Sequence, residues 1–579
     1  MMNRTNLLSR TLLRAALLIA LIALVLAQIP SRSASTAEDA ALTGKVTSDA
    51  EGAMEGVIVG AKKVGSPMAT WVVSNAQGQY SFPRGRMEPG KYAIKIRAVG
   101  YELPNTSVDV TAQPTRLDLQ LTKVTGTSKV AMQLSNGEWL MSVPGTQQEK
   151  TTFASTCVTC HTLQRILFSR YDADAMTQVV LRMAMHTNNS SPMHPWVRPS
   201  EGAAPEPTAR QLALAKYISS INLSSSDTFQ FPLKTNPRPK GKATEVIYTT
   251  YDLPRPDAAP HDTAIDAEGN VWYSDFDSQF IGKLNPKTGK VVEYPVPLGR
   301  KGPLAQGGLQ IAIDRQGLVY YGNMSQMQVV RLDQKTGKME FSKVPVPEPN
   351  IGAAHLTMID PSFQNVDGKI WVNVAGANGE GGEGGAVVGE AGGTWHVDLA
   401  SDTWTHVTHP HGSPPAGAYD VVANSENNMF GMGFGNPRIW ITNGKTLQTV
   451  WYDMPAGDTG CRRGHVDSQD RLSCGGFNGN DVVMFNPKAE QKFKNWKSLT
   501  PWTRPYDAEF DNKKYAWGAG MDTDLAMRVN VDTGEITEYL LPHETNVRHV
   551  DVQKSEALSS LWLGDQHGGT IIHIEPLAP

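Results

Sequence analysis

DAEGNVW at residues 266–272 and NPKTGK at residues 285–290 form the clearest copy of a repeat that decides the fold of the C-terminal half. The same order returns at 314–320 with 333–338, and again at 511–517 with 532–534. Each copy reads as strand, tight turn, strand, strand, glycine turn and strand. Repeats of about 40–50 residues with four strands each indicate a β-propeller.

Aligned on the first turn, the chain contains seven such units. Their first strands begin near His261, Leu309, His355, Tyr419, Arg462, Tyr506 and Arg548. The longest interval contains a Gly-rich insertion at 376–393, which we expect to be a mobile loop. The last unit has only three strands, and EVIY at 245–248 has the pattern of the missing fourth. The sequence therefore predicts a seven-bladed propeller over residues 245–579, closed by 245–248 so that two sheet edges are covered.

A second motif, Cys157-Val158-Thr159-Cys160-His161, matches the pattern of c-type haem attachment. Two thiols three positions apart reach the two vinyl groups of one haem, and the adjacent imidazole then lies beneath the iron. The alternatives are a redox CxxC and half of a zinc site, but a zinc site needs two further ligands nearby at matching spacing. The motif predicts one covalent haem c, with Cys157 and Cys160 as attachment sites and His161 as proximal ligand.

The distal iron ligand has two equal candidates. Met193 lies in a loop before a predicted C-terminal helix, and Met183 lies on the preceding helix. Weaker candidates are Met185, His186 and His194. A methionine ligand raises the haem potential relative to a second histidine, although most helical methionines simply pack in a core.

The N-terminus has the layout of a secretory signal peptide, which we assign to residues 1–35. Arg4, Arg10 and Arg14 precede an uncharged apolar run at 15–27. This run is shorter than the ~20 residues that span a membrane, and no later segment is long and apolar enough to span one. We expect a periplasmic or otherwise exported protein with no transmembrane segment in the mature chain.

Residues 133–222 have a helical pattern around the CxxCH motif. Segments 172–186 and 208–221 read as amphipathic helices, and Thr208 with Gln211 fits a capping box. A further helix should contain the motif. This arrangement resembles a small class I cytochrome c domain. The Ser-, Pro- and Lys-rich stretch 223–244 reads as a linker.

Residues 41–124 alternate in β fashion between closely spaced turns, as in GVIV at 56–59, GQYSF at 78–82 and EPGKY at 88–92. This succession resembles the carboxypeptidase regulatory-like, transthyretin-like β-sandwich. The segment contains no cluster of His, Cys or carboxylate residues, so we assign it no chemistry. The predicted fold class is therefore multidomain and mainly β.

The propeller repeats resemble the streptogramin B (virginiamycin B) lyase family, most clearly from Pro260-His261 through Pro297. The resemblance implies a catalytic His at the start of an inner strand, a carboxylate after the Trp strand and a magnesium ion. His261 and Asp275 occupy these offsets in the first unit, with Asp in place of the family's usual Glu. The last unit has Asp565 at the carboxylate offset but Arg548 where the His would be.

Inner-strand starts and the ends of second strands lie around the channel mouth of a propeller, so one face should gather a ring of polar side chains. Its predicted members are His261, Asp275, Asn323, His355, Tyr419, Arg462, Tyr506, Arg548 and Asp565, with His465 and His549 nearby. Such a ring suits a polar or anionic small molecule or a divalent metal such as Mg²⁺, and an imidazole suits general-base chemistry. A polar channel mouth that holds only water is the alternative.

Composition narrows the function classes. Lys and Arg number 53 and Asp and Glu 57, which gives a net charge of −4 and no support for nucleic-acid binding. Four cysteines exclude a disulfide-rich scaffold, and pairing of Cys461 with Cys474 stays open.

We interpret the chain as an exported monohaem cytochrome with a periplasmic electron donor or acceptor, coupled to a propeller that binds a substrate or partner. The alternatives are a C–O lyase with metal at the propeller mouth and a non-catalytic scaffold.

Overall fold

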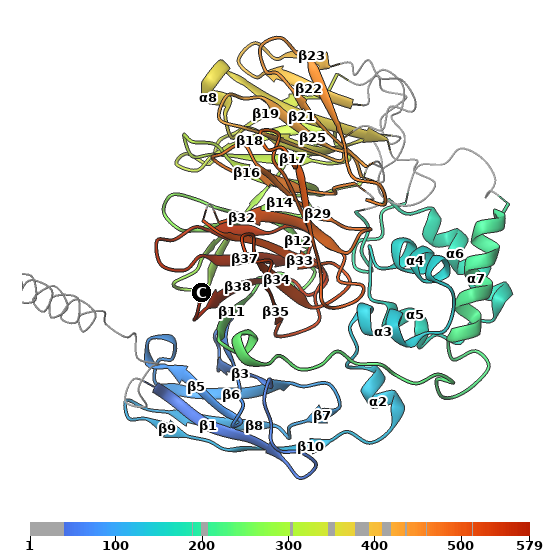
Figure 1. Ribbon diagram of the computed structural model, residues 1–579, viewed down its shortest axis with the longest axis vertical. Coiled ribbons are helices and arrows are strands. Elements are labelled where there is room, and N and C mark those ends of the chain that lie inside the picture. Colours follow the sequence, from blue (N-terminus) through green and yellow to red (C-terminus); the bar gives the residue numbers. More distant parts are fainter. Residues whose placement is uncertain are drawn as a thin grey trace, which may run out of the picture.

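The computed structural model describes residues 40–187, 189–197, 206–300, 305–345, 354–376, 393–407, 418–434, 437–458, 460–511 and 513–579 (Figure 1). The predicted signal segment 1–35 and all but the ends of the Gly-rich insertion lie outside these ranges. The fold is mainly β and consists of several sheets. Within the described ranges, no helix combines the length and apolar character needed to cross a membrane.

Six consecutive four-stranded antiparallel sheets follow the repeat units. Blade one has β12 (Pro260–Ile265), β13 (Val271–Asp275), β14 (Phe280–Asn285) and β15 (Lys290–Pro295); blade two has β16 (Gly308–Ile313), β17 (Leu318–Asn323), β18 (Gln328–Asp333) and β19 (Met339–Lys343). Blade three has β20 (Ala354–Asp360), β21 (Lys369–Gly376), β22 (Gly393–Asp398) and β23 (Thr403–Val407), with the short helix α8 (Gln364–Asp367); blade four has β24 (Asp420–Ala423), β25 (Met429–Met432), β26 (Arg438–Thr442) and β27 (Thr449–Asp453). Blade five has β28 (Gly464–Val466), β29 (Leu472–Gly476), β30 (Asp481–Phe485) and β31 (Phe493–Lys497); blade six has β32 (Pro505–Phe510), β33 (Tyr515–Gly520), β34 (Leu525–Asn530) and β35 (Ile536–Leu540).

The first strands of these sheets form a closed ring. Contacts run from β12 through β16, β20, β24, β28 and β32 to β36 (Asp551–Gln553), and β36 contacts β12. Trp272, Trp371, Trp440 and Trp517, each on the second or third strand of its blade, are almost completely buried. The arrangement is a seven-bladed propeller, in which each sheet buries its faces against its neighbours.

Blade seven is closed by a strand from far earlier in the chain. β37 (Ser560–Asp565) and β38 (Thr570–Pro576) continue from β36, and β11 (Val246–Asp252) pairs antiparallel with β38. The register runs from Val246 opposite Pro576 to Asp252 opposite Thr570. The closing strand predicted from EVIY at 245–248 is thus confirmed.

The other edge of β11 belongs to the N-terminal sandwich. β11 pairs antiparallel with β4 (Met68–Val73), so blade seven continues through β4 into β3 (Ile58–Lys63), β6 (Gly90–Arg97) and β8 (Thr106–Val110) as one eight-stranded sheet. The Trp71 indole donates to Thr250 Oγ1 at 3.0 Å across this junction.

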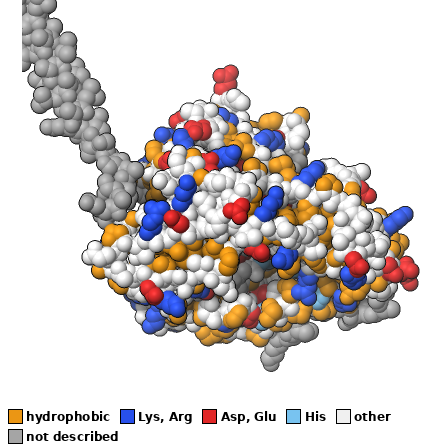
Figure 2. All heavy atoms as spheres, turned by 90° about the horizontal axis from the view of Figure 1, so that it is seen from below, with side chains coloured by type: hydrophobic (Ala, Val, Ile, Leu, Met, Phe, Trp, Pro, Cys, Tyr) orange, Lys and Arg blue, Asp and Glu red, His pale blue; other side chains and the backbone are white. Residues whose placement is uncertain are grey.

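The second sandwich sheet is built around β1. Its strands are β2 (Gly52–Ala53), β1 (Ala40–Ser48), β10 (Leu119–Lys123) and β7 (Tyr101–Glu102), with β5 (Gln79–Pro83) and β9 (Thr115–Arg116) also pairing with β1 and the 3₁₀ turn η2 (Arg84–Arg86) following β5. Val59, Phe82 and Leu121 are among the residues buried between the two sheets. The face seen in Figure 2 intersperses charges of both signs, in keeping with the small net charge.

The helices lie beside the propeller, between the sandwich and blade one in the sequence (Figure 1). They are α2 (Thr127–Ala131), α3 (Asn136–Ser142), α4 (Gln147–Cys157), α5 (Leu163–Leu167), α6 (Ala173–Ala184) and α7 (Ala209–Ile221). Thr208 caps α7 in the predicted capping box with Gln211. The Phe153 ring of α4 meets the Tyr217 ring of α7 edge to face at 6.0 Å, which packs these two helices together.

Residues 223–244, predicted as a linker, are packed against the protein. Phe229 is buried, with its ring 5.0 Å from that of Trp139 and 5.3 Å from that of Phe168. Arg238 forms an ion pair with Glu51 of the sandwich, and the 3₁₀ turn η3 (Gly241–Thr244) leads into β11. The composition of this segment predicted a linker, and the aromatic side chain of Phe229 packs it against the helices.

Cys461 and Cys474 form a buried disulfide in blade five, with their Cα atoms 5.7 Å apart. Cys474 lies on β29, and Cys461 immediately precedes Arg462 and Arg463. This settles the pairing that the sequence left open. Cys157 and Cys160 are not disulfide-bonded.

The double variant Cys461→Ser/Cys474→Ser should unfold more easily than the wild type. The disulfide closes a short loop across a sequence separation of 13 residues, and a loop of this size contributes about 3 kcal/mol by restricting the unfolded chain. Urea denaturation followed by circular dichroism measures the change. Reduced wild-type protein is the matched control and should unfold like the variant. An unchanged free energy of unfolding in both samples would contradict this role.

Candidate functional site

The CxxCH motif lies where α4 ends and the chain turns into α5. Cys157 is the last residue of α4, and Cys160 and His161 follow in the turn. The amide of Leu163 donates to Asn136 Oδ1 at 2.8 Å, which fixes the start of α5. Nδ1 of His161 lies 3.1 Å from the carbonyl oxygen of Thr162. Because a carbonyl only accepts, Nδ1 carries the proton and Nε2 keeps its lone pair.

A cavity of about 420 Å³ opens beside the motif, and Cys157, Cys160 and His161 all line it. Its apolar lining includes Ile166, Met176, Val179, Val180 and Ile218. Burial raises the pKa of the Cys157 thiol to about 12 and lowers the pKa of His161. At neutral pH the site therefore presents protonated thiols and a neutral imidazole in apolar surroundings.

The structure separates the candidates for the distal ligand. Met183 and His186 line the cavity that contains both cysteines. Met193 instead lines a second cavity of about 480 Å³, which contains Cys160 and His161 but not Cys157. The His194 imidazole pairs with Asp257 at 2.7 Å. Met185 follows the end of α6 and lines neither of the two cavities.

The motif rests directly on the propeller. The guanidinium of Arg548 donates to the carbonyl oxygen of Thr159, and Asn546 Nδ2 lies 3.5 Å from the carbonyl oxygen of Val158. Gln566 and His567 of blade seven line the second cavity together with His161. Although the two segments are nearly 400 residues apart, the CxxCH loop and the propeller share one site.

The predicted mouth residues are buried rather than open to solvent. Tyr419 and Tyr506 are hydrogen-bonded through their hydroxyl groups, and the Arg462 guanidinium lies 3.6 Å from the ring centroid of Tyr506. Burial lowers the pKa of Arg462 to about 9. Tyr419, Arg462, Tyr506 and Arg548 are each at most 7% exposed. Aromatic and guanidinium groups fill the mouth, and the CxxCH loop lies over it.

His261 and Asp275 have separate partners. Nδ1 of His261 lies 2.6 Å from Asp262, while its buried Nε2 has no hydrogen-bond partner in the described part of the chain. Asp275 forms an ion pair with Arg255, and burial and the neighbouring Asp277 raise its pKa. His261 lies on β12 and Asp275 lies on β13 opposite Pro260, and their side chains contact different groups.

Two further predicted mouth residues are Asp565 and His355. Asp565 accepts a hydrogen bond from the amide of Asn546 at 3.0 Å. His355 lies on β20, opposite Ala375 in register, and its side chain falls outside the described part.

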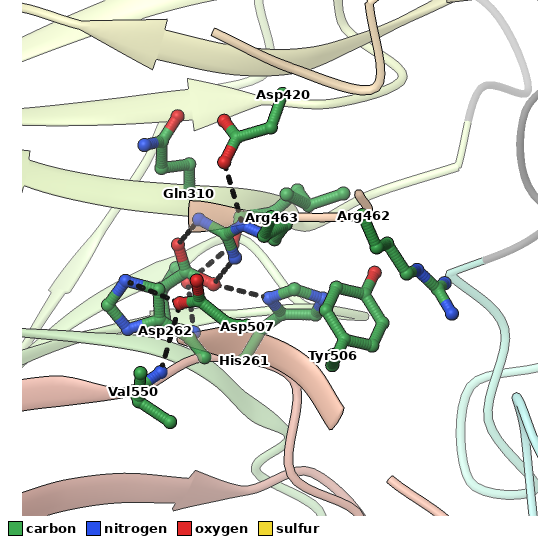
Figure 3. Close-up of polar contacts among 12 residues, drawn as sticks. His261, Asp262, Gln310, Asp420, Arg462, Arg463, Tyr506, Asp507 and Val550 are labelled. Carbon is green, nitrogen blue, oxygen red and sulfur yellow. Dashed lines mark hydrogen bonds and ion pairs between the residues drawn. The ribbon is translucent and has the colours of Figure 1, made fainter. Parts of the chain in front are cut away.

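A layer of charged side chains lies one residue further along the inner strands (Figure 3). Arg463 binds Asp262 through both terminal nitrogens, at 2.6 and 2.7 Å, and Asp507 accepts a hydrogen bond from the Val550 amide at 3.2 Å. Asp420 lies 3.9 Å from Arg463. The sequence pattern did not single out Asp262, Asp420, Arg463 and Asp507, although each immediately follows a predicted mouth residue in its repeat.

Comparison with known proteins supports the N-terminal assignment. The model of the carboxypeptidase regulatory-like domain matches residues 41–122. No curated protein matches the chain.

Solved structures similar to the chain include a streptogramin B lyase, with 17% identity over 58% of this chain and 99% of that chain and a TM-score of 0.46. Selenomethionine-substituted virginiamycin B lyase from Staphylococcus aureus is 15% identical over 57% of this chain and 99% of that chain, with a TM-score of 0.43. The β-propeller domain of Cps50 (Swd1) from Myceliophteria thermophila is 10% identical over 56% of this chain and 98% of that chain, with a TM-score of 0.42.

The buried Asp262–Arg463 pair should be sensitive to loss of one partner. Asp262→Asn is expected to lower the free energy of unfolding by about 3–5 kcal/mol, because it leaves a buried guanidinium without its carboxylate. In Asp262→Leu/Arg463→Met the charge is gone from both sides, so stability should recover in part. Urea denaturation of both variants measures this. Equal stability of Asp262→Asn and the wild type would show that the pair is not a coupled unit.

Proposed function

We propose that this protein is an exported monohaem c-type cytochrome that carries electrons to or from a periplasmic partner. The haem is attached through Cys157 and Cys160, with His161 as proximal ligand. The observation that carries the proposal is that these three side chains line one cavity with an apolar wall. A haem bound there supplies a one-electron carrier.

The residues around the motif fit this group. The cavity volume of about 420 Å³ lies in the range of cofactor sites, and neither thiol is in a disulfide. The hydrogen bond from Nδ1 of His161 to Thr162 orients the ring and leaves Nε2 for the iron, as metal-bound imidazoles require.

A zinc site at the motif is less well supported. In the described ranges, one group of three or more His, Cys, Asp or Glu residues has ligand atoms within 4.8 Å of one another. That group does not include any residue of the CxxCH motif. Zinc needs four ligands at such close spacing.

We assign the distal position to Met183, because Met183 shares the cavity with both cysteines and Met193 does not. His186 lines the same cavity and is the second candidate there. A thioether from α6 and the imidazole of His161 would then hold the iron.

Three exposed apolar or aromatic side chains line the two cavities. Tyr171 and Met183 at the rim of the first are 48% and 38% exposed, and Met193 at the second is 68% exposed. Apolar side chains around a redox group suit brief docking of an electron-transfer protein. The lyase alternative needs an open mouth, and the burial of Tyr419, Tyr506 and Arg548 does not favour it.

Protein exported from a host with cytochrome c maturation should contain one covalent haem per chain in a pyridine haemochrome assay. Cys157→Ala/Cys160→Ala should lose it. A folded wild-type protein without covalent haem would refute the proposal.

Met183→Ala should lose the methionine–iron charge-transfer band and lower the reduction potential, because a weaker or solvent ligand replaces the thioether. Met193→Ala is the matched control and should keep both properties. His186→Ala distinguishes the second candidate. If Met193→Ala alone removes the band, the assignment of Met183 is wrong.

The function itself is tested by following the haem absorbance during a screen of periplasmic metabolites and donor proteins. Reduction by one class of donor identifies the partner class. If the haem is in place but no donor or acceptor exchanges electrons with it, the electron-transfer role fails.

A further inference from the structure

A separate cluster of metal-ligand side chains lies in the propeller channel. His465 is on β28, Asp507 is on β32, and His549 lies just before β36. One ligand atom from each residue lies within 4.8 Å of the other two. Oδ2 of Asp507 is 3.1 Å from Nε2 of His465 and 3.7 Å from Nε2 of His549. We propose that His465, Asp507 and His549 bind a first-row divalent transition-metal ion.

The donor set selects the class of ion. Two imidazole nitrogens with one carboxylate oxygen suit Zn²⁺, Fe²⁺ and related ions, whereas Mg²⁺ prefers oxygen ligands and retains water. Three protein ligands leave coordination positions for water or a small molecule. The His465 side chain is 29% exposed, so an ion can reach the site, while Asp507 and His549 are 1% and 7% exposed.

His549 supplies an independent observation. Among the described residues, its buried Nδ1 has no hydrogen-bond partner, and its Nε2 lies 3.7 Å from Oδ2 of Asp507, too far for a hydrogen bond.

The site is independent of the proposed haem, because none of its three residues lines either cavity beside the CxxCH motif. Measurements of haem content and of metal binding in the channel therefore test the two proposals separately.

The test uses the full-length holoprotein, stripped with a chelator and then titrated with Zn²⁺. Elemental analysis should find one zinc per chain beyond the haem iron, which is counted separately in the haemochrome assay. His465→Ala and His549→Ala should each weaken zinc binding by more than ~100-fold, beyond the effect expected for an outer-shell partner. Millimolar Mg²⁺ should not displace the zinc.

His406→Gln is the control, because His406 is a partly buried imidazole on β23 outside the cluster, and the zinc affinity of this variant should equal that of the wild type. Circular dichroism checks that the variants fold; if His549→Ala does not, the more exposed His465→Ala decides. Absence of stoichiometric zinc, equal zinc binding by the cluster variants, or displacement by Mg²⁺ would overturn the proposal.

Discussion

The pairing of β11 on both of its edges is the interaction on which the architecture depends. One edge of β11 bonds to β38 and closes the seven-bladed ring, and the other bonds to β4 of the sandwich. Without β11, β38 would present an open edge and the sandwich would lose its continuous sheet with the propeller. A single strand of Val246–Asp252 therefore sets both the closure of the ring and the position of the N-terminal sandwich.

The same constraint positions the helices. They lie in the sequence between β10, which is fixed in the sandwich, and β11, which is fixed in blade seven. Arg238, paired with Glu51, holds the returning chain close to the sandwich. With both ends anchored, the CxxCH loop comes to rest on the propeller mouth, where Arg548 and Asn546 bind its backbone carbonyls. The propeller mouth is thus covered by a segment whose two ends are fixed in the sandwich and in blade seven.

Local patterns were sufficient to predict much of this. The repeat predicted the blades, the EVIY segment predicted the closing strand, and Thr208 with Gln211 predicted the start of α7. The burial of the mouth was not predictable, because it depends on packing between segments hundreds of residues apart. Asp275 shows the same limit: its position on β13 followed from the repeat, but its pairing with Arg255 rather than His261 depends on side-chain direction. The repeat placed Asp262 and Arg463 beside predicted mouth residues, but their pairing across 201 residues of sequence cannot be read from either segment alone.

The disulfide in blade five has a consequence for biogenesis. Cys461 and Cys474 must be oxidised, whereas Cys157 and Cys160 must remain thiols until thioether formation if the proposed haem is to be attached. If the chain is exported, both requirements apply in one oxidising compartment. Each pair is close in sequence, so an oxidase could equally join Cys157 to Cys160 and block haem ligation. Maturation of this protein would therefore require a reductant that acts on Cys157 and Cys160. The disulfide between Cys461 and Cys474 is enclosed in a hydrophobic core, which protects it from that reductant.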